Sequence, residues 1–221
     1  MERNSTEFFD YVKNNTMTPE STFQFSCEAC GNCCRKRAEP ILLTGIDILN
    51  IARAKQITTR DVIEKYTTTY IGGSSKLPLA VLKEREYDGS CSFLRAGKCS
   101  IQNDKPIVCR MYPLGRYFDP RDDSVNYFMI DGGAQCGNPD TAKTWTLKEW
   151  LDAFDIKKYD DDTLVWNQVL VNLTKIFIKA TSQAEIEKNA NLAGKILYFD
   201  IDFRNPASYG AQLIRLFESF R

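Results

Sequence analysis

The stretch SCEACGNCCRK, residues 26–36, places four cysteines within eight positions: Cys27, Cys30, Cys33 and Cys34. A spacing of two residues lets a tight turn direct two sulfurs at one ion, because thiolates bind zinc or iron at roughly 2.3 Å. Gly31 lies inside the run and allows the backbone to approach a bound metal. Three interpretations are open: one wall of a metal site, a set of disulfides, or a group of unrelated buried thiols.

The remaining cysteines lie downstream, and the last 85 residues contain none. They are Cys91, Cys99, Cys109 and Cys136. The run of Cys27, Cys30 and Cys33 resembles the runs that hold three corners of a cubane, with a distant fourth cysteine as the last ligand. Neighbouring side chains diverge in an extended chain, so Cys34 is expected to serve a second metal or to bridge two metals. Eight thiols suit two four-sulfur sites, or one cluster of several metals that share thiolates.

The whole chain favours metal binding over disulfides. It has 221 residues, enough to bury a core without covalent cross-links. No stretch approaches the roughly 18 consecutive apolar residues of a membrane span, and the first residues lack the features of a secretory signal. We therefore expect a cytoplasmic protein, in which thiols stay reduced and clustered cysteines bind metal.

Charge and composition narrow the function further. Lys and Arg total 29, as do Asp and Glu, so the overall charge indicates neither nucleic acid nor an anionic membrane as a partner. The chain has no histidine, which excludes Ser-His and Cys-His nucleophilic pairs and every metal site that needs an imidazole. A metal must therefore be held mainly by sulfur. The triple run and the missing histidine favour an iron–sulfur cluster, of which [4Fe–4S] is one form, over zinc.

The expected fold class is α+β, with a small irregular cysteine-rich metal-binding core and short strands, followed by a helical C-terminal half. We expect one compact unit over residues 1–221, with a metal-binding region at 20–140 and a helical extension at 145–221. Residues 43–55 and 58–66 are predicted helices, in which Thr44 with Asp47 and Thr58 with Asp61 form capping pairs. Residues 76–87, 89–101 and 123–133 are predicted to form short strands and turns.

Particular residues in these segments carry further expectations. Pro78 argues for an edge strand. Thr146 and Glu149 predict a capping box at the start of a helix. Residues 160–180 predict a helix with one apolar face, formed by Val165, Val169, Leu173 and Ile176. In residues 205–220, Pro206 is expected at the first position of a helix whose apolar side carries Leu213, Leu216, Phe217 and Phe220.

The cysteine-bearing segments resemble a known family. CEACGNCCR at 27–35, ILLTGIDILNIA at 41–52, CSFLRAGKCSIQNDKPIVCRMYPLG at 91–115 and a last Cys136 resemble the YkgJ-type CxxCxxCC cysteine-cluster family, described as a zinc- or iron-chelating domain. The segments are more distantly similar to the cysteine-rich part of the flagellin lysine N-methylases, which are thought to use an iron–sulfur cluster. The resemblance implies that all eight cysteines are metal ligands. Gln102 and Lys105 depart from the family, which tends to have an aromatic residue and an arginine there.

Other side chains near the cysteines have alternative roles. Arg35 and Arg110 follow cysteines, and a cation there would lower thiol pKa values or simply form a surface ion pair. Tyr112 and Pro113 could shield a site from water, although core packing explains them better. Asp47 could be an oxygen ligand, but its capping position explains it more simply. The segment DGGAQC, 131–136, could form a small-molecule loop, although no nucleotide-binding motif accompanies it.

The sequence therefore predicts a metal-binding protein whose all-cysteine site, with iron–sulfur favoured, has a structural or redox role. Two alternatives stay open. One is a zinc-binding structural or interaction module. The other is a cluster-dependent enzyme, such as a transferase similar to a protein lysine N-methylase, whose partner would be a protein substrate. For the favoured metal-binding protein, the expected partners are a metal ion or cluster and a redox partner.

Overall fold

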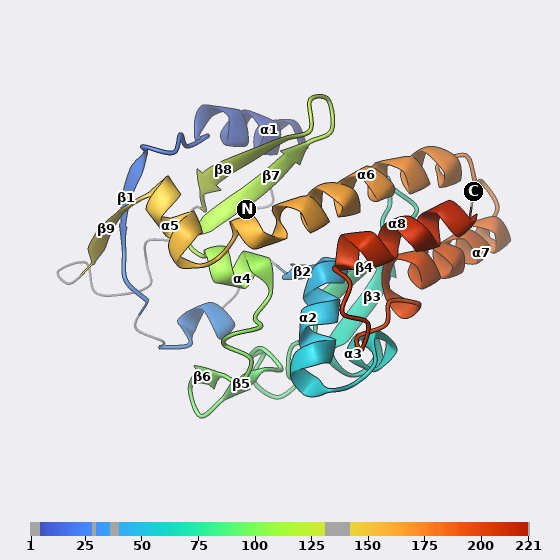
Figure 1. The fold of residues 1–221 in the computed structure, drawn as a ribbon, viewed down its shortest axis with the longest axis horizontal. Coiled ribbons are helices and arrows are strands. Elements are labelled where there is room, and N and C mark those ends of the chain that lie inside the picture. The colour runs from blue at the N-terminus through green and yellow to red at the C-terminus, as the bar shows by residue number, and fades with distance from the viewer. Residues whose placement is uncertain (1–4, 28–29, 36–39, 131–141, 221) are drawn as a thin grey trace. The chain divides into compact units, whose positions relative to one another are not determined.

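The computed structural model describes residues 5–27, 30–35, 40–130 and 142–220 (Figure 1). The chain divides into two units, and each unit is built from two separate segments. The first unit comprises Met1–Asn32 and Ile107–Lys158, and the second comprises Cys33–Pro106 and Tyr159–Arg221. The division thus falls inside the cysteine motif. The expectation of a single compact body over 1–221, and its boundaries at 20–140 and 145–221, stay predictions.

The first unit contains two antiparallel strand pairs. Strands β1 and β9 pair, as do β7 and β8. Its elements are α1 Ser5–Asn14, β1 Thr22–Phe25, α4 Ile107–Met111, β7 Leu114–Asp119, β8 Ser124–Met129, β9 Lys143–Thr146, α5 Leu147–Ala153 and η4 Lys157–Tyr159. Trp150 on α5 is 2% exposed and packs edge-on against Phe23 and Phe25 of β1. Its indole nitrogen donates a hydrogen bond to the Met111 carbonyl, 3.0 Å away, so α5 joins β1 to the end of α4.

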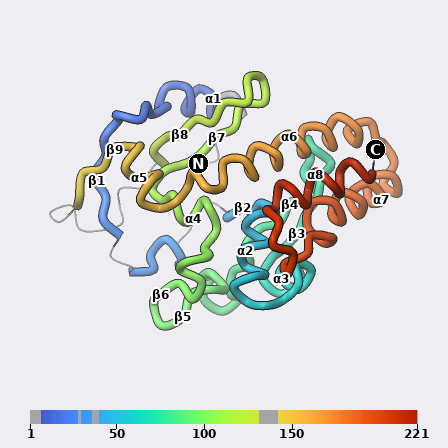
Figure 2. The backbone as a smooth tube through the Cα atoms, viewed as in Figure 1, coloured from blue at the N-terminus to red at the C-terminus, as the bar shows by residue number. Residues whose placement is uncertain are grey.

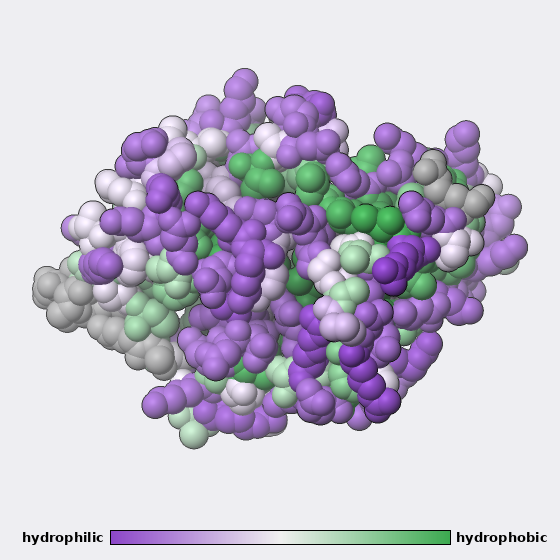
Figure 3. Space-filling view, viewed as in Figure 1, coloured by the Kyte–Doolittle hydropathy of each residue, from purple (hydrophilic) through white to green (hydrophobic). Residues whose placement is uncertain are grey.

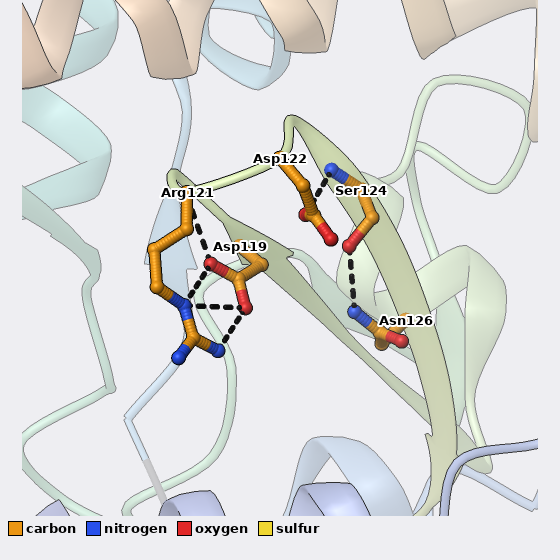
Figure 4. A network of polar contacts seen from close by, with 5 residues as sticks. All are labelled: Asp119, Arg121, Asp122, Ser124 and Asn126. Atoms are coloured by element: carbon orange, nitrogen blue, oxygen red, sulfur yellow. Dashed lines mark hydrogen bonds and ion pairs between the residues drawn. The ribbon is translucent and has the colours of Figure 1, made fainter.

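Polar side chains fix the turn between β7 and β8 (Figure 4). The Asp119 carboxylate accepts hydrogen bonds from the Arg121 backbone N–H at 3.0 Å and from the Arg121 guanidinium. The Asp122 carboxylate accepts one from the Ser124 backbone N–H at 3.0 Å, and Asn126 donates to the Ser124 hydroxyl. The two carboxylates thus accept hydrogen bonds from backbone N–H groups of the turn that have no partner in the strand pairing.

The second unit combines a three-stranded antiparallel sheet, in the order β2-β4-β3, with helices from both of its chain segments. Its first segment contributes β2 Leu42–Leu43, α2 Gly45–Lys55, α3 Thr59–Tyr66, β3 Thr67–Ile71, β4 Pro78–Leu82, β5 Leu94–Arg95 and β6 Lys98–Cys99. Its second segment contributes α6 Asp160–Phe177, α7 Gln183–Gly194, the π-helix η5 Lys195–Phe199 and α8 Tyr209–Phe220. The short 3-10 helix η1, Asn32–Cys34, spans the division between the units.

Helices α6 and α8 lie side by side, as the tube in Figure 2 shows. At the start of α8, Tyr209 is 1% exposed and donates a hydrogen bond to the Leu197 carbonyl at 2.9 Å. The Gly210 N–H donates to Asp162 on α6, also at 2.9 Å. In α2, Ile48, Leu49, Ile51 and Ala52 are buried. The two segments of this unit therefore share one core.

The structure confirms the α+β class. The short strands described all lie before residue 147, only helices follow them, and the strand pairs described are antiparallel. The three expected capping pairs are reciprocal boxes at α2, α3 and α5. The Asp47 carboxylate accepts from the Thr44 N–H at 2.9 Å, which confirms its role as a cap. Within the described residues, no helix combines the length and apolar character needed to cross a membrane.

The prediction that Pro78 marks an edge strand is wrong. Strand β4 is the middle strand of its sheet and pairs with both β2 and β3. Pro78 is its first residue, opposite Ile71, whereas β2 pairs only with Ala80 and Val81 further along. A proline at the first position of a strand removes no hydrogen bond that the inner part of the ladder needs.

Two details of the C-terminal helices also differ from expectation. The buried face of α6 is formed by Thr163, Trp166, Val169, Leu173 and Phe177, while Ile176 is 46% exposed. Figure 3 shows apolar atoms along the seam between α6 and α8. Pro206 precedes α8, which begins at Tyr209, because the Asn205 side chain accepts a hydrogen bond from the Ala207 N–H and holds this segment in a turn.

Candidate metal centre

Cys33 and Cys34 lie on η1 in the second unit, and their backbone is helical instead of extended. Their sulfurs are 4.0 Å apart. Two thiolates on one tetrahedral ion, each at 2.3 Å, would be about 3.8 Å apart. The expected divergence of these neighbours depends on an extended chain, and that condition is not met. The pair can therefore face one metal.

Cys91 is hydrogen-bonded to Cys34 of this pair. Its backbone N–H donates a hydrogen bond to the Cys34 carbonyl at 2.7 Å, and its side chain is 6% exposed. The Cys91 thiol also lies within hydrogen-bonding reach of the Cys34 thiol. Residues 57 positions apart in the sequence thus place their sulfurs together.

Cys99 joins the group through a short hairpin. Strands β5 and β6 pair Leu94 with Cys99, and Ala96 and Gly97 between the strands have φ values of 46° and 79°. Both positive φ values are typical of a two-residue hairpin turn. The Leu94 N–H donates to the Cys91 carbonyl at 3.0 Å, so a turn that starts at Cys91 leads into the strand that faces Cys99.

Backbone N–H groups point at two of these sulfurs. The Phe93 N–H donates to the Cys91 sulfur, 3.4 Å away, and the Ile101 N–H donates to the Cys99 sulfur. In both cases the donor lies two residues after the cysteine. Such hydrogen bonds stabilise negative charge on sulfur and tune a bound metal.

Hydrogen bonds and one cation shift the thiol pKa values. The hydrogen bond from Cys34 lowers the pKa of Cys33 to about 6, and the positive charge of Lys105 acts in the same direction. Hydrogen bonds with Cys33 and Cys91 raise the pKa of Cys34. Burial raises the pKa of Cys99, and the Ile101 N–H and Lys105 oppose that rise.

Lys105 is the site residue that the sequence reasoning missed. In the sequence Lys105 stands out only as a departure from a family pattern, whereas Arg35 and Arg110 directly follow cysteines. Its charge acts on both Cys33 and Cys99. The signal available was a lysine six residues after Cys99. The guanidinium of Arg35 lies beside the hairpin turn, 3.8 Å from the position of a Cβ on Gly97.

The other described cysteines belong to the first unit. Cys27 follows β1, Cys30 precedes Gly31, and Cys109 is on α4. Gly31 has a φ of 73°, which glycine adopts without strain. The rings of Phe25 and Tyr112 are 5.7 Å apart, so the chain just before Cys27 contacts the chain just after Cys109. This contact agrees with a packing role for Tyr112.

Two expectations fall outside this description. Cys136 and the segment 131–136 lie outside the described residues. Among the described residues, no disulfide joins two cysteines. Within the described ranges, no three His, Cys, Asp or Glu side chains stand close enough to hold a metal ion without rearrangement. Metal binding by these thiols therefore requires side-chain movement.

Comparison with known proteins assigns the cysteine-rich segment. Residues 26–129 match the model of the CxxCxxCC family, described as a "putative zinc- or iron-chelating domain". The match includes every cysteine except Cys136. This segment therefore has the cysteine pattern of the CxxCxxCC family. The more distant likeness to flagellin lysine N-methylases stays a prediction.

One curated relative is an uncharacterized protein of Methanocaldococcus jannaschii. It is 29% identical over 91 residues, which make up 40% of this chain and 44% of that protein. The matched region thus spans less than half of the relative's length. No solved structure matches the chain.

Proposed function

We propose that the protein binds metal through an all-cysteine site, with an iron–sulfur cluster favoured, and that this site has a structural or redox role. The observation that carries the proposal is the placement of four cysteines in one unit: Cys34 contacts both Cys33 and Cys91, and Cys99 lies on the hairpin that follows Cys91. The four residues come from a helical turn, a loop and a hairpin. Local sequence does not require this placement, and thiolates are the ligands that both iron–sulfur clusters and zinc accept.

The surroundings of the sulfurs support iron–sulfur. Backbone N–H groups of Phe93 and Ile101 donate to sulfur, and Lys105 offsets negative charge. Hydrogen bonds to sulfur and local charge are the features by which proteins set the potential of a cluster. When bound, such a cluster would supply one-electron transfer. The chain's own residues would hold it and adjust its potential.

Zinc is the second candidate, and a specific observation favours it. The separation of 4.0 Å between the Cys33 and Cys34 sulfurs suits two ligands of a single tetrahedral ion. A two-iron cluster also binds two thiolates per iron, whereas a cubane binds its cysteines through different irons. The pair therefore supports either zinc or a two-iron cluster more directly than a [4Fe–4S] cluster.

Anaerobic purification with elemental analysis tests the proposal. We expect iron and acid-labile sulfide in the protein, with absorbance near 400 nm that bleaches on reduction. Stoichiometric zinc in a colourless preparation would contradict iron–sulfur and support zinc, the second candidate. A preparation that holds neither metal after anaerobic reconstitution with iron and sulfide, or with zinc, would overturn metal binding itself.

A further inference from the structure

We infer that Cys33, Cys34, Cys91 and Cys99 form one complete four-thiolate centre, carried by the second unit alone. The inference rests on the proposed metal-binding function and specifies its ligands. It divides the cysteine motif between Cys30 and Cys33. The last two cysteines of the run then bind with the hairpin cysteines, and Cys27 and Cys30 serve a different site.

The backbone of the second unit holds two of these ligands in a fixed relation. The hydrogen bond from the Cys91 N–H to the Cys34 carbonyl, at 2.7 Å, joins η1 to the loop that precedes β5. Cys91 also forms an isolated antiparallel bridge with Glu84. These backbone bonds define the positions of Cys34 and Cys91, and the proposed centre requires the Cys33, Cys34 and Cys91 side chains to turn toward one ion.

The fourth ligand lies on the hairpin that follows Cys91. Cys91 accepts the Leu94 N–H, Leu94 pairs with Cys99, and the Ser100 N–H donates to the Phe93 carbonyl at 2.9 Å. Cys99 is therefore fixed to the chain that carries Cys91. The charges of Cys91 and Cys33 both act on the Cys99 thiol, as expected if the three lie near one another.

The charged and polar groups near the four thiols also suit a metal that is bound by all four within this unit. Four thiolates around a divalent ion leave two net negative charges, and thiols must lose protons to bind. Lys105 belongs to the same unit and its charge acts on Cys33 and Cys99, which lie at opposite ends of the ligand set along the chain. The N–H groups of Phe93 and Ile101 stabilise the remaining charge on sulfur.

Cys27 and Cys109, which are not ligands of the proposed centre, lie near a separate cluster of aromatic side chains. Phe25, two residues before Cys27, packs against Tyr112, three residues after Cys109, and both positions belong to the first unit. The Met111 carbonyl and the Phe25 ring both contact Trp150. Cys27 and Cys109 are thus tied to one aromatic cluster that includes no residue of the four-thiolate centre.

Alkylation of the metal-loaded full-length protein tests this division without mutation. Limiting amounts of a chelator are added, newly exposed thiols are labelled with iodoacetamide, and labelled peptides are identified by mass spectrometry. We expect Cys33, Cys34, Cys91 and Cys99 to become reactive together, as a set distinct from Cys27, Cys30 and Cys109. Simultaneous exposure of all seven, or co-exposure of Cys30 with Cys33, would overturn the inference.

Matched variants give a second measurement. Cys99→Ser should remove protection from Cys33, Cys34 and Cys91 and lower the metal content to about half, while Cys30→Ser should leave those three protected. Equal loss of all metal in both variants would mean one shared centre. Failure of the proposed function is a different result, because wild-type protein would then hold no metal and all its cysteines would react from the start.

Discussion

At the scale of the residue, backbone conformation decides what adjacent cysteines can do. Cys33 and Cys34 would diverge in a strand, but in the 3-10 turn Asn32–Cys34 their sulfurs are 4.0 Å apart. The sequence alone does not distinguish these two conformations. A doubled cysteine therefore predicts a shared metal only where the chain turns.

Lys105 should matter to metal retention. Its charge favours the thiolate forms of Cys33 and Cys99, so its loss raises the pKa values of both thiols and lets protons displace metal at higher pH. In Lys105→Met we expect the midpoint of acid-induced metal release to rise by roughly a few tenths of a pH unit, since salt and solvent screen part of the charge. Release is followed with a chromogenic chelator.

Lys179→Met is the matched control for this change. Lys179 is an exposed lysine after α6 in the same unit. Its removal changes the net charge equally but should leave the release midpoint unchanged. An equal shift in both variants would show that net charge, and not the position of Lys105, controls metal release.

Asp119 should give the first unit an acid-sensitive contribution to stability. The hydrogen bonds from Arg121 lower the pKa of Asp119 to about 2, from an ordinary value near 3.8. A carboxyl whose pKa falls on folding stabilises the protein above its unfolded pKa, and this contribution is lost as the pH falls through the folded pKa. We expect Asp119→Asn to melt below wild type at pH 7, with the difference narrowing between about pH 4 and pH 2.

Thermal unfolding by circular dichroism at several pH values measures this difference. Arg121→Gln should reproduce the pH pattern, and the double variant should add little to either single one, because both changes remove the same contact. A gap between wild type and Asp119→Asn that stays constant down to pH 2 would contradict the assignment.

At the scale of the element, helix starts follow from local chemistry. The boxes at Thr44, Thr58 and Thr146 were predicted from spacing alone and form as expected, since cap and third residue are neighbours in any helix that begins there. The buried face of α6 was predicted only in part. Whether Ile176 on this helix is buried or exposed depends on where α8 and the other helices pack.

Gly45, at the start of α2, should tolerate no side chain. A Cβ there would collide with the ring and hydroxyl of Tyr209, which is 1% exposed and hydrogen-bonded to the Leu197 carbonyl. Gly45→Ala should lower the free energy of unfolding by about 1–3 kcal/mol, because Tyr209 or α2 must shift. Urea unfolding measures the change.

Gly73→Ala serves as the control, because a Cβ at Gly73 meets no atom within 4 Å. Its effect should stay within about 0.5 kcal/mol. Alanine is a better helix former than glycine. A gain in stability for Gly45→Ala would therefore contradict the prediction and mean that Tyr209 shifts without an energetic cost.

At the scale of the whole molecule, each unit joins two segments that are far apart in the sequence. The first unit joins Met1–Asn32 to Ile107–Lys158, and the second joins Cys33–Pro106 to Tyr159–Arg221. The helical segment after residue 145 therefore contributes residues to both units.

Metal removal should destabilise the protein, because binding energy at a folded site is also folding energy. We expect a chelator to lower the melting temperature, and readdition of the metal to restore it. Metal-stripped, denatured protein should contain eight reactive thiols, one for each cysteine. A count near zero without reductant would support four disulfides, and an unchanged melting temperature would argue against a metal site that stabilises the fold.

The sequence by itself determined the chemistry of this protein. Eight cysteines and no histidine restrict its metal ligands to sulfur and oxygen, and capping pairs and apolar periodicity define most of its helices, because these features depend on residues close in the chain. Only the tertiary structure decided that the Cys91 N–H donates to the Cys34 carbonyl, that β5 and β6 pair Cys99 with Leu94, and that the charge of Lys105 acts on Cys33. Such contacts join residues that are not neighbours in sequence, and they depend on how the backbone turns and pairs across the fold.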